Sequence, residues 1–155
     1  MDQAAKKKLL RDFTYGLYAV TIADGSGFTA NWLSQASFDP PVLMLSVENS
    51  SHSISIIRNT KVFLVNVFAT GQRELAGQLG RAFARTPNKM EGINVQPGPQ
   101  GCPILQDTLG WLECRVTAEV PAGDSTVFVT EVVEAGSLNE GAPLTMNETG
   151  FRHFG

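Results

Sequence analysis

The chain has 155 residues, of which 43% are hydrophobic, a mean hydropathy near zero and a formal charge of -3. This size and composition fit one globular domain over residues 1–155, with a core large enough to fold without disulfides. The charge balance gives no reason to expect nucleic-acid binding, and no apolar run approaches the roughly 20 residues that cross a bilayer.

The termini and the cysteines place further limits on the class of protein. The N-terminus has no apolar run after its charged residues, so we expect no signal peptide and a cytoplasmic protein. Cys102 and Cys114 have neither the spacing of a disulfide framework nor that of a metal site, so we expect two reduced thiols. With His52 and His153 as its only histidines, the chain is not expected to bind a metal.

Hydrophobic periodicity predicts short helices and strands along the whole chain. A Pro- and Gly-rich stretch at 94–103 is predicted to be an extended surface connection. In chain order, the predicted elements are helix 3–13, strand 18–22, strand 42–47, helix 53–59, strand 62–68, helix 72–84, and a β-hairpin of strands 108–120 and 126–133.

This pattern predicts a mainly β fold, an antiparallel barrel with a few short helices. Closing a sheet into a barrel removes its exposed edges. Regular alternation of strands and helices is absent, and there is no G-x-G-x-x-G motif. Gly25-Ser26-Gly27 is only a turn, so a dinucleotide-binding parallel sheet is not expected.

Two polar segments flank the predicted strand at 42–47. Residues 29–37 precede it and residues 49–53 follow it, and both are rich in Ser, Thr and Asn. Loops with only a structural role use such residues at one or two turn positions, whereas here donors continue over two successive loops. A helix predicted to begin at Ser53 would add amide donors and a favourable dipole for a phosphate. The two segments therefore predict a pocket for a flat polar ligand that carries a phosphate.

The order and spacing of several motifs resemble those of the flavin reductase-like family, whose fold is an antiparallel, Greek-key-like FMN-binding split β-barrel. Within it, NWLSQAS with YGLY is particularly similar to the reductase modules of flavodiiron proteins and high-molecular-weight rubredoxins, and to flavoredoxin. The motifs are YGLYAVT at 15–21, TANWLSQASFDPP at 29–41, NSSHS at 49–53, FLVNVF at 63–68, NKMEG at 88–92, GCPIL at 101–105, WLEC at 111–114, GDS at 123–125 and FRHFG at 151–155.

The resemblance implies a homodimer that binds FMN, with FAD less expected, and transfers a hydride from NADH or NADPH to the flavin. The reduced flavin would then leave or pass electrons to a protein acceptor. Trp111, Phe151 and Phe154 are apolar groups that a monomer of this size could leave exposed, which fits a dimer. Neither nucleic acid nor membrane is expected as a partner.

The resemblance also implies which residues bind the cofactor. Residues 29–37 would follow the isoalloxazine ring, residues 49–53 the phosphate and ribityl chain, and Lys89 would lie near the phosphate. The expected cofactor-binding residues are Thr29, Ala30, Asn31, Trp32, Ser34, Gln35, Ser37, Asn49, Ser50, Ser51, His52, Ser53, Asn66 and Lys89.

Each of these residues also has a purely structural interpretation. Asn31 could form a turn, and Trp32 could anchor the core. Ser51 or Ser53 could serve only as a helix cap, and Lys89 could be an ordinary surface lysine. Asn66 lies in the middle of an apolar strand, so its amide needs a partner, which is either backbone or ligand.

One motif departs from the family pattern. Many members carry Gly-Asp-His in the last hairpin, where the His lies near the nicotinamide, but this chain has Gly123-Asp124-Ser125. The change weakens the case for a free-standing NAD(P)H:flavin reductase and leaves flavin binding untouched. The alternative is a flavoredoxin-like electron-transfer module that keeps its FMN and serves a protein partner. A flavin- or haem-binding sensor is a third interpretation, although no His-based haem site is evident.

Overall fold

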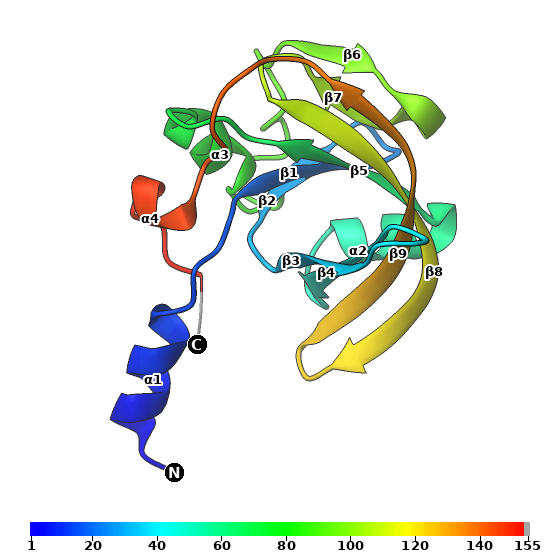
Figure 1. Ribbon diagram of the computed structural model, residues 1–155. Helices are drawn as coiled ribbons and strands as arrows, with labels where there is room; N and C mark the ends of the chain where they lie inside the picture. The colour runs from blue at the N-terminus through cyan, green and yellow to red at the C-terminus, as the bar shows by residue number, and fades with distance from the viewer. Residues whose placement is uncertain (154–155) are drawn as a thin grey trace.

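The computed structural model describes residues 1–153, which form a curled antiparallel sheet flanked by short helices (Figure 1). No helix in this part of the chain is long and apolar enough to cross a membrane. The elements are α1 (Gln3–Arg11), β1 (Tyr18–Thr21), β2 (Gly27–Ala30), β3 (Leu33–Ser37), β4 (Val42–Glu48), α2 (Ser53–Thr60), β5 (Val62–Val67), α3 (Arg73–Leu79), β6 (Val95–Pro97), the 3₁₀ helix η1 (Pro99–Gly101), β7 (Pro103–Leu105), β8 (Gly110–Ala122), β9 (Ser125–Ser137) and α4 (Met146–Thr149).

Seven strands form one sheet in the order β2-β1-β5-β8-β9-β4-β3, and every neighbouring pair is antiparallel. The outermost strands, β2 and β3, are separated in sequence only by Asn31 and Trp32. The sheet must therefore curl until its two edges approach each other. The Trp32 carbonyl at this junction accepts a hydrogen bond from Ser46 N at 2.9 Å. The predicted antiparallel barrel is confirmed.

The long hairpin of β8 and β9 bends around the barrel (Figure 1). Each strand has 13 residues; β9 is longer than predicted, and β8 is as long as predicted but begins two residues later. The turn between them uses Gly123 at φ +63°. Register shifts lie between Glu113 and Cys114 and between Val116 and Ala118. Such bulges bend a strand and increase its twist, which allows one long hairpin to follow the curved sheet.

The core has two main parts. Residues from β1, β4, β5 and β9 fill the inside of the barrel, with Ile22, Leu45, Phe63 and Phe128 fully buried. A second cluster lies between the sheet and the helices α3 and α4, and Phe68 is fully buried in it. The second cluster fixes α3, and with it the loop that follows, against the sheet.

Two predicted segments differ from the structure. The helix predicted at 72–84 ends at Leu79, because the Lys89 ammonium binds the carbonyls of Leu79 and Arg81. A continuing helix would need those carbonyls for its own amides. Gly77 and Gly80 also lower the helix propensity.

The predicted surface connection at 94–103 is instead a short hairpin of β6 and β7, and its last part is buried. Cys102 is fully buried against Leu64 and Ile104. Burial raises the pKa of Cys102 to about 11 and that of Cys114 to about 12. Both thiols are free, and they remain protonated and unreactive near neutral pH.

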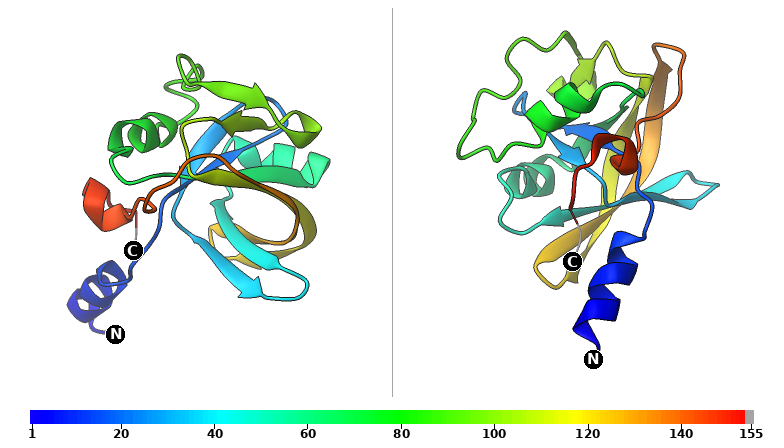
Figure 2. Two further views of the ribbon diagram at one scale, coloured as in Figure 1. Left: turned by 45° about the horizontal axis from the view of Figure 1, so that its top comes forward. Right: turned by 90° about the vertical axis from the view of Figure 1, so that its left-hand side faces the viewer.

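Helix α1 stands away from the body of the protein (Figures 1 and 2). The Asp2 carboxylate caps it by accepting from the amides of Ala4 and Ala5, both at 3.0 Å. None of its residues is buried, and Leu9 and the following Phe13 are 59% and 60% exposed. The predicted amphipathic helix therefore forms, but its apolar side has no partner among the residues described.

Asn66 joins three strands inside the fold. Its amide nitrogen donates to the Ala19 carbonyl at 3.3 Å and to Thr21 Oγ1 at 3.2 Å, and its Oδ1 accepts from Leu105 N at 2.9 Å. The residue is completely buried, and these three contacts are all with the protein itself. Asn66 therefore fastens β1 and β7 to β5.

We predict that Asn66→Ala lowers the free energy of unfolding by about 2–3 kcal/mol, because it leaves the buried Leu105 amide without an acceptor. Chemical denaturation monitored by circular dichroism measures the change. Asn147→Ala, at an exposed position of α4, is the matched control and should stay within about 0.5 kcal/mol of the parent. Equal losses in the two variants would contradict this role for Asn66.

Candidate functional site

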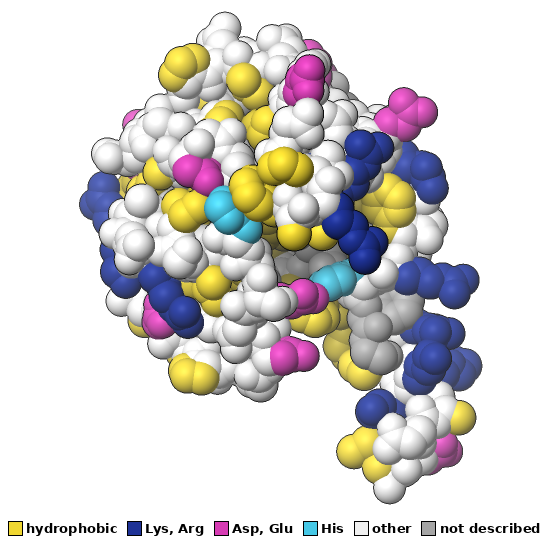
Figure 3. Space-filling view, turned by 180° about the vertical axis from the view of Figure 1, so that it is seen from behind, with side chains coloured by type: hydrophobic (Ala, Val, Ile, Leu, Met, Phe, Trp, Pro, Cys, Tyr) yellow, Lys and Arg dark blue, Asp and Glu magenta, His cyan; other side chains and the backbone are white. Residues whose placement is uncertain are grey.

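A pocket of about 570 Å³ opens between the β2–β3 junction, the start of α2 and the loop after α3. Its volume is within the range of small-molecule and cofactor sites. Figure 3 shows the corresponding face, with a hollow near its centre, histidines at two places around it and Lys and Arg side chains gathered along one side. The lining consists of residues 26–32, 46–48, 50–53 and 79–84 with Lys89 and His153.

The two polar segments predicted from the sequence meet in this pocket. Residues 29–32 and 50–53 line it, together with Lys89. The Thr29 hydroxyl donates to the Ala76 carbonyl at 2.6 Å and so holds β2 against α3. Thr29 therefore lines the pocket and also fastens its wall to α3.

The first turn of α2 forms one end of the pocket. Ser51 Oγ accepts from Ser53 N at 3.3 Å, as expected for a serine that caps the helix, although the cap position itself is His52. The His52 side chain makes no capping hydrogen bond. Because a helix N-terminus presents amides and a positive dipole, this end of the pocket favours an anion.

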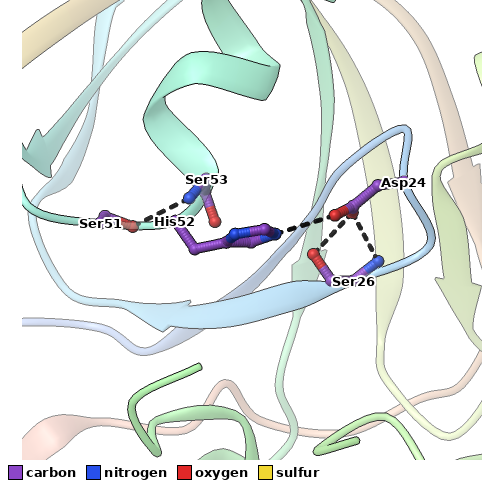
Figure 4. A network of polar contacts seen from close by, with 5 residues as sticks. All are labelled: Asp24, Ser26, Ser51, His52 and Ser53. Atoms are coloured by element: carbon purple, nitrogen blue, oxygen red, sulfur yellow. Dashed lines mark hydrogen bonds and ion pairs between the residues drawn. The ribbon is translucent and has the colours of Figure 1, made fainter. Parts of the chain in front are cut away.

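His52 is held between a carboxylate and an aromatic ring. Its Nε2 lies 3.0 Å from Asp24 Oδ2, and Asp24 Oδ1 accepts from the amide and hydroxyl of Ser26 at 2.9 and 2.6 Å (Figure 4). One face of the imidazole stacks on the Phe83 ring, with ring centroids 3.7 Å apart and an angle of 3° between the ring planes. Burial opposes ionisation of Asp24, but hydrogen bonds from Ser26 and His52 outweigh it and lower the pKa of this carboxyl.

Lys89 is a buried cation without a counter-charge. It is 6% exposed, and its Nζ donates to the carbonyls of Leu79 at 2.9 Å and Arg81 at 3.0 Å. Within residues 1–153, no carboxylate forms an ion pair with it. Burial lowers the pKa of this ammonium, and two of its three donors are used. An unpaired buried charge is unfavourable, so the third donor and the charge fit an anionic ligand.

The other end of the pocket is formed by the β2–β3 junction and the C-terminal segment. The Asn31 amide nitrogen donates to the His153 carbonyl at 3.0 Å and contacts Met146 Sδ at 3.4 Å. Asn31 Oδ1 forms no hydrogen bond within the described part of the chain and can accept one from a ligand. The Trp32 and His153 rings lie 4.9 Å apart, and His153 Nε2 is 3.4 Å from Glu48 Oε1.

The structure places five of the expected site residues outside the pocket lining. Asn49 Oδ1 accepts from the Thr126 hydroxyl at 2.7 Å, and Asn49 N donates to the Asp124 carbonyl at 2.9 Å. Asn49 thus ties the serine-rich loop to the β8–β9 turn. Asn66 is bound inside the fold, as described above. The remaining three, Ser34, Gln35 and Ser37, lie on edge strand β3. The Ser34 and Gln35 side chains donate to carbonyls of the same strand, and the Ser37 hydroxyl has no hydrogen-bond partner within the described residues.

Sequence reasoning missed several residues that shape the pocket. Ser26 was assigned only to a turn, Asp24 was not singled out, and Arg81 and Phe83 were assigned to a helix that ends before them. The Asp-Gly-Ser-Gly turn at 24–27 carried a weak signal, because it has two polar side chains, Asp24 and Ser26, beside the glycines that form the turn. Nothing in the sequence indicated that Phe83 would reach His52, since the contact joins segments more than 30 residues apart.

Comparisons with known proteins agree in sequence and in fold. The profile of the flavin reductase like domain matches residues 10–155. The high molecular weight rubredoxin of Moorella thermoacetica is 34% identical over 143 residues, which are 89% of this chain and 62% of that protein. The FMN reductase (NADH) SmoA of Agrobacterium fabrum is 28% identical over 151 residues, which are 96% of this chain and 84% of that protein.

Among solved structures, a flavin reductase domain protein from Arthrobacter sp. FB24 superposes with a TM-score of 0.82 at 30% identity. The superposition covers 92% of this chain and 89% of that one. The chain spans 62%, 45% and 25% of the lengths of three longer curated relatives. The match over residues 10–155, together with this likeness in fold, shows that the chain belongs to the flavin reductase-like family.

Proposed function

We propose that this chain binds FMN in the pocket and transfers a hydride to it from NADH or NADPH. The observation that carries the proposal is the buried, unpaired Lys89 ammonium, which lines the same pocket as the N-terminus of α2. Two positive groups in one pocket fit a ligand with a phosphate. Family membership and the relative named FMN reductase (NADH) support a flavin as this ligand and hydride transfer from a nicotinamide nucleotide as the reaction.

The residues present fit FMN in two parts. Ser51, His52 and Ser53 at the start of α2, together with Lys89 and Arg81, supply donors and positive charge for the phosphate. Asn31 Oδ1 at the other end can accept a hydrogen bond from the ring N3–H, because its amide nitrogen is already bound to His153. Ser34, Gln35, Ser37, Asn49 and Asn66 would support the pocket walls without touching the ligand.

FMN supplies the hydride-accepting ring, and the chain's own residues bind and orient it. Hydride transfer between two stacked rings depends mainly on their geometry, so no protein acid or base is required for that step. Ser125, which stands where many members have His, donates to Asp124 within its own turn at 3.2 Å.

A second candidate is an electron-transfer module that retains FMN and serves a protein partner. The relation to high molecular weight rubredoxin favours it, since this chain covers only 62% of that longer protein. The Ser125 substitution also favours it. The two candidates share the cofactor and differ in the electron donor.

We expect anaerobic mixing of the FMN-loaded protein with NADH or NADPH to bleach the flavin absorption band within seconds, as measured by stopped-flow spectroscopy. Ser55→Ala, an exposed position of α2 outside the pocket, is the control variant and should react like the parent. If neither nucleotide bleaches the band while a reduced iron–sulfur or flavin protein does, the electron-transfer module is the correct interpretation.

The double change Ser51→Ala, Ser53→Ala should weaken FMN binding by about a hundredfold or more, since each lost hydrogen bond to a charged group contributes roughly 1.5–3 kcal/mol. Riboflavin, which lacks the phosphate, should lose much less affinity. Fluorescence titration of the parent, the double variant and Ser55→Ala with both flavins measures the difference. Equal losses for FMN and riboflavin would mean that these serines only cap the helix.

We also propose that the chain forms a homodimer through α1. The apolar side of this helix is uncovered. Four of the twelve Lys and Arg residues of the chain lie in α1, whereas the chain as a whole has a formal charge of -3. A second copy therefore offers both an apolar partner and opposite charge. Trp111 and Phe151, predicted as exposed apolar groups, are instead half-buried against the core, and Phe154 lies outside the described residues.

Sedimentation at micromolar concentration should give about twice the chain mass of 16.7 kDa. Changing Leu9 and Phe13 to Asp should shift the protein toward the monomer, because it removes the apolar side of α1. Phe38→Asp, at a site 91% exposed and far from α1 in sequence, is the control and should leave the mass unchanged. A parent protein that sediments as a monomer would refute the dimer.

A further inference from the structure

The stack of His52 on Phe83 closes one side of the pocket beside the phosphate end. His52 comes from the start of α2 and Phe83 comes from the loop after α3, so the stack joins two separate segments of the pocket lining. With centroids 3.7 Å apart and planes at 3°, the rings are in direct contact and leave no room for a third ring between them. The pocket is therefore bounded next to the residues that would hold the phosphate.

A carboxylate contacts the imidazole of this stack. Asp24 binds the outer edge of the imidazole at 3.0 Å, and Ser26 holds Asp24 through two hydrogen bonds. The imidazole cannot rotate away from Phe83 without losing the Asp24 contact. A second phosphate that passed His52 would approach this carboxylate, and like charges at short range repel.

We propose that the closed His52–Phe83 stack, with Asp24 behind it, selects FMN over FAD. The inference rests on the proposed function, because it assumes that the phosphate of a flavin lies at the start of α2. FMN ends at its one phosphate and fits in front of the stack. FAD continues through a second phosphate and an adenosine, which would have to separate the two rings and pass the carboxylate.

The alternative, that Phe83 is a platform for the adenine, agrees less well with the geometry. His52 covers one face of Phe83, so an adenine could stack only on the opposite face of that ring. The stack is also held from outside by Asp24, which stabilises the closed arrangement. The three residues together form a boundary and leave no open stacking site between the rings.

The test compares the affinities of the 155-residue chain for FMN, FAD and riboflavin by isothermal titration calorimetry. The variants are Phe83→Ala, Phe83→Leu and Asp24→Asn, with Phe38→Ala as an exposed control outside the pocket. In Phe83→Ala, the ratio of the Kd for FAD to the Kd for FMN should fall about tenfold or more. Phe83→Leu keeps apolar bulk without a ring, so this ratio should fall less. Asp24→Asn should also lower the ratio, because it removes the negative charge that would repel the second phosphate of FAD.

The outcomes separate this inference from the function on which it rests. If the parent binds neither FMN nor FAD, the proposed function is wrong. If the parent binds FMN but the ratio in Phe83→Ala is unchanged, or FAD alone weakens, the stack does not exclude FAD. Equal weakening of all three flavins, with a lower melting temperature, would mean that Phe83 only supports the loop, and this too would overturn the proposal.

Discussion

Two residues, Asn31 and Trp32, connect the outermost strands of a seven-stranded sheet, and this short connection controls the rest of the structure. Two residues cannot span the width of a flat sheet, so the sheet has to curl until β2 and β3 approach each other. The long β8–β9 hairpin follows the curve through its two bulges. The same connection brings Asn31 and Trp32 into the lining of the pocket.

The pocket combines rigid walls with an incomplete charge balance. The α2 N-terminus and the Lys89 ammonium both contribute positive potential to it, and within the described part of the chain no carboxylate forms an ion pair with Lys89. The negative groups near the pocket, Asp24 and Glu48, lie next to His52 and His153 instead. Positive and negative groups therefore lie close together around the pocket, each carboxylate next to a histidine.

Lys89 has a second consequence for the shape of the site. By binding the carbonyls of Leu79 and Arg81, it stops α3 and turns the following segment toward the pocket. Arg81 and Phe83 line the pocket only because the helix ends before them. Gln78 supports the same turn by donating to the carbonyls of Lys89 and Glu91. One buried cation therefore provides both charge and backbone geometry.

The sequence alone determined the β-rich class, the long hairpin, the two polar segments that meet in the pocket and the family resemblance. These features depend on periodicity and on residues close together in the chain, so a single sequence contains them. Tertiary structure decided the end of α3, the enclosure of Asn66, the burial of Cys102 and the Asp24–His52–Phe83 arrangement. Each of these results from contacts between distant segments. Local preference does not encode such contacts, because the free energy that favours them comes from packing and hydrogen bonding across the fold.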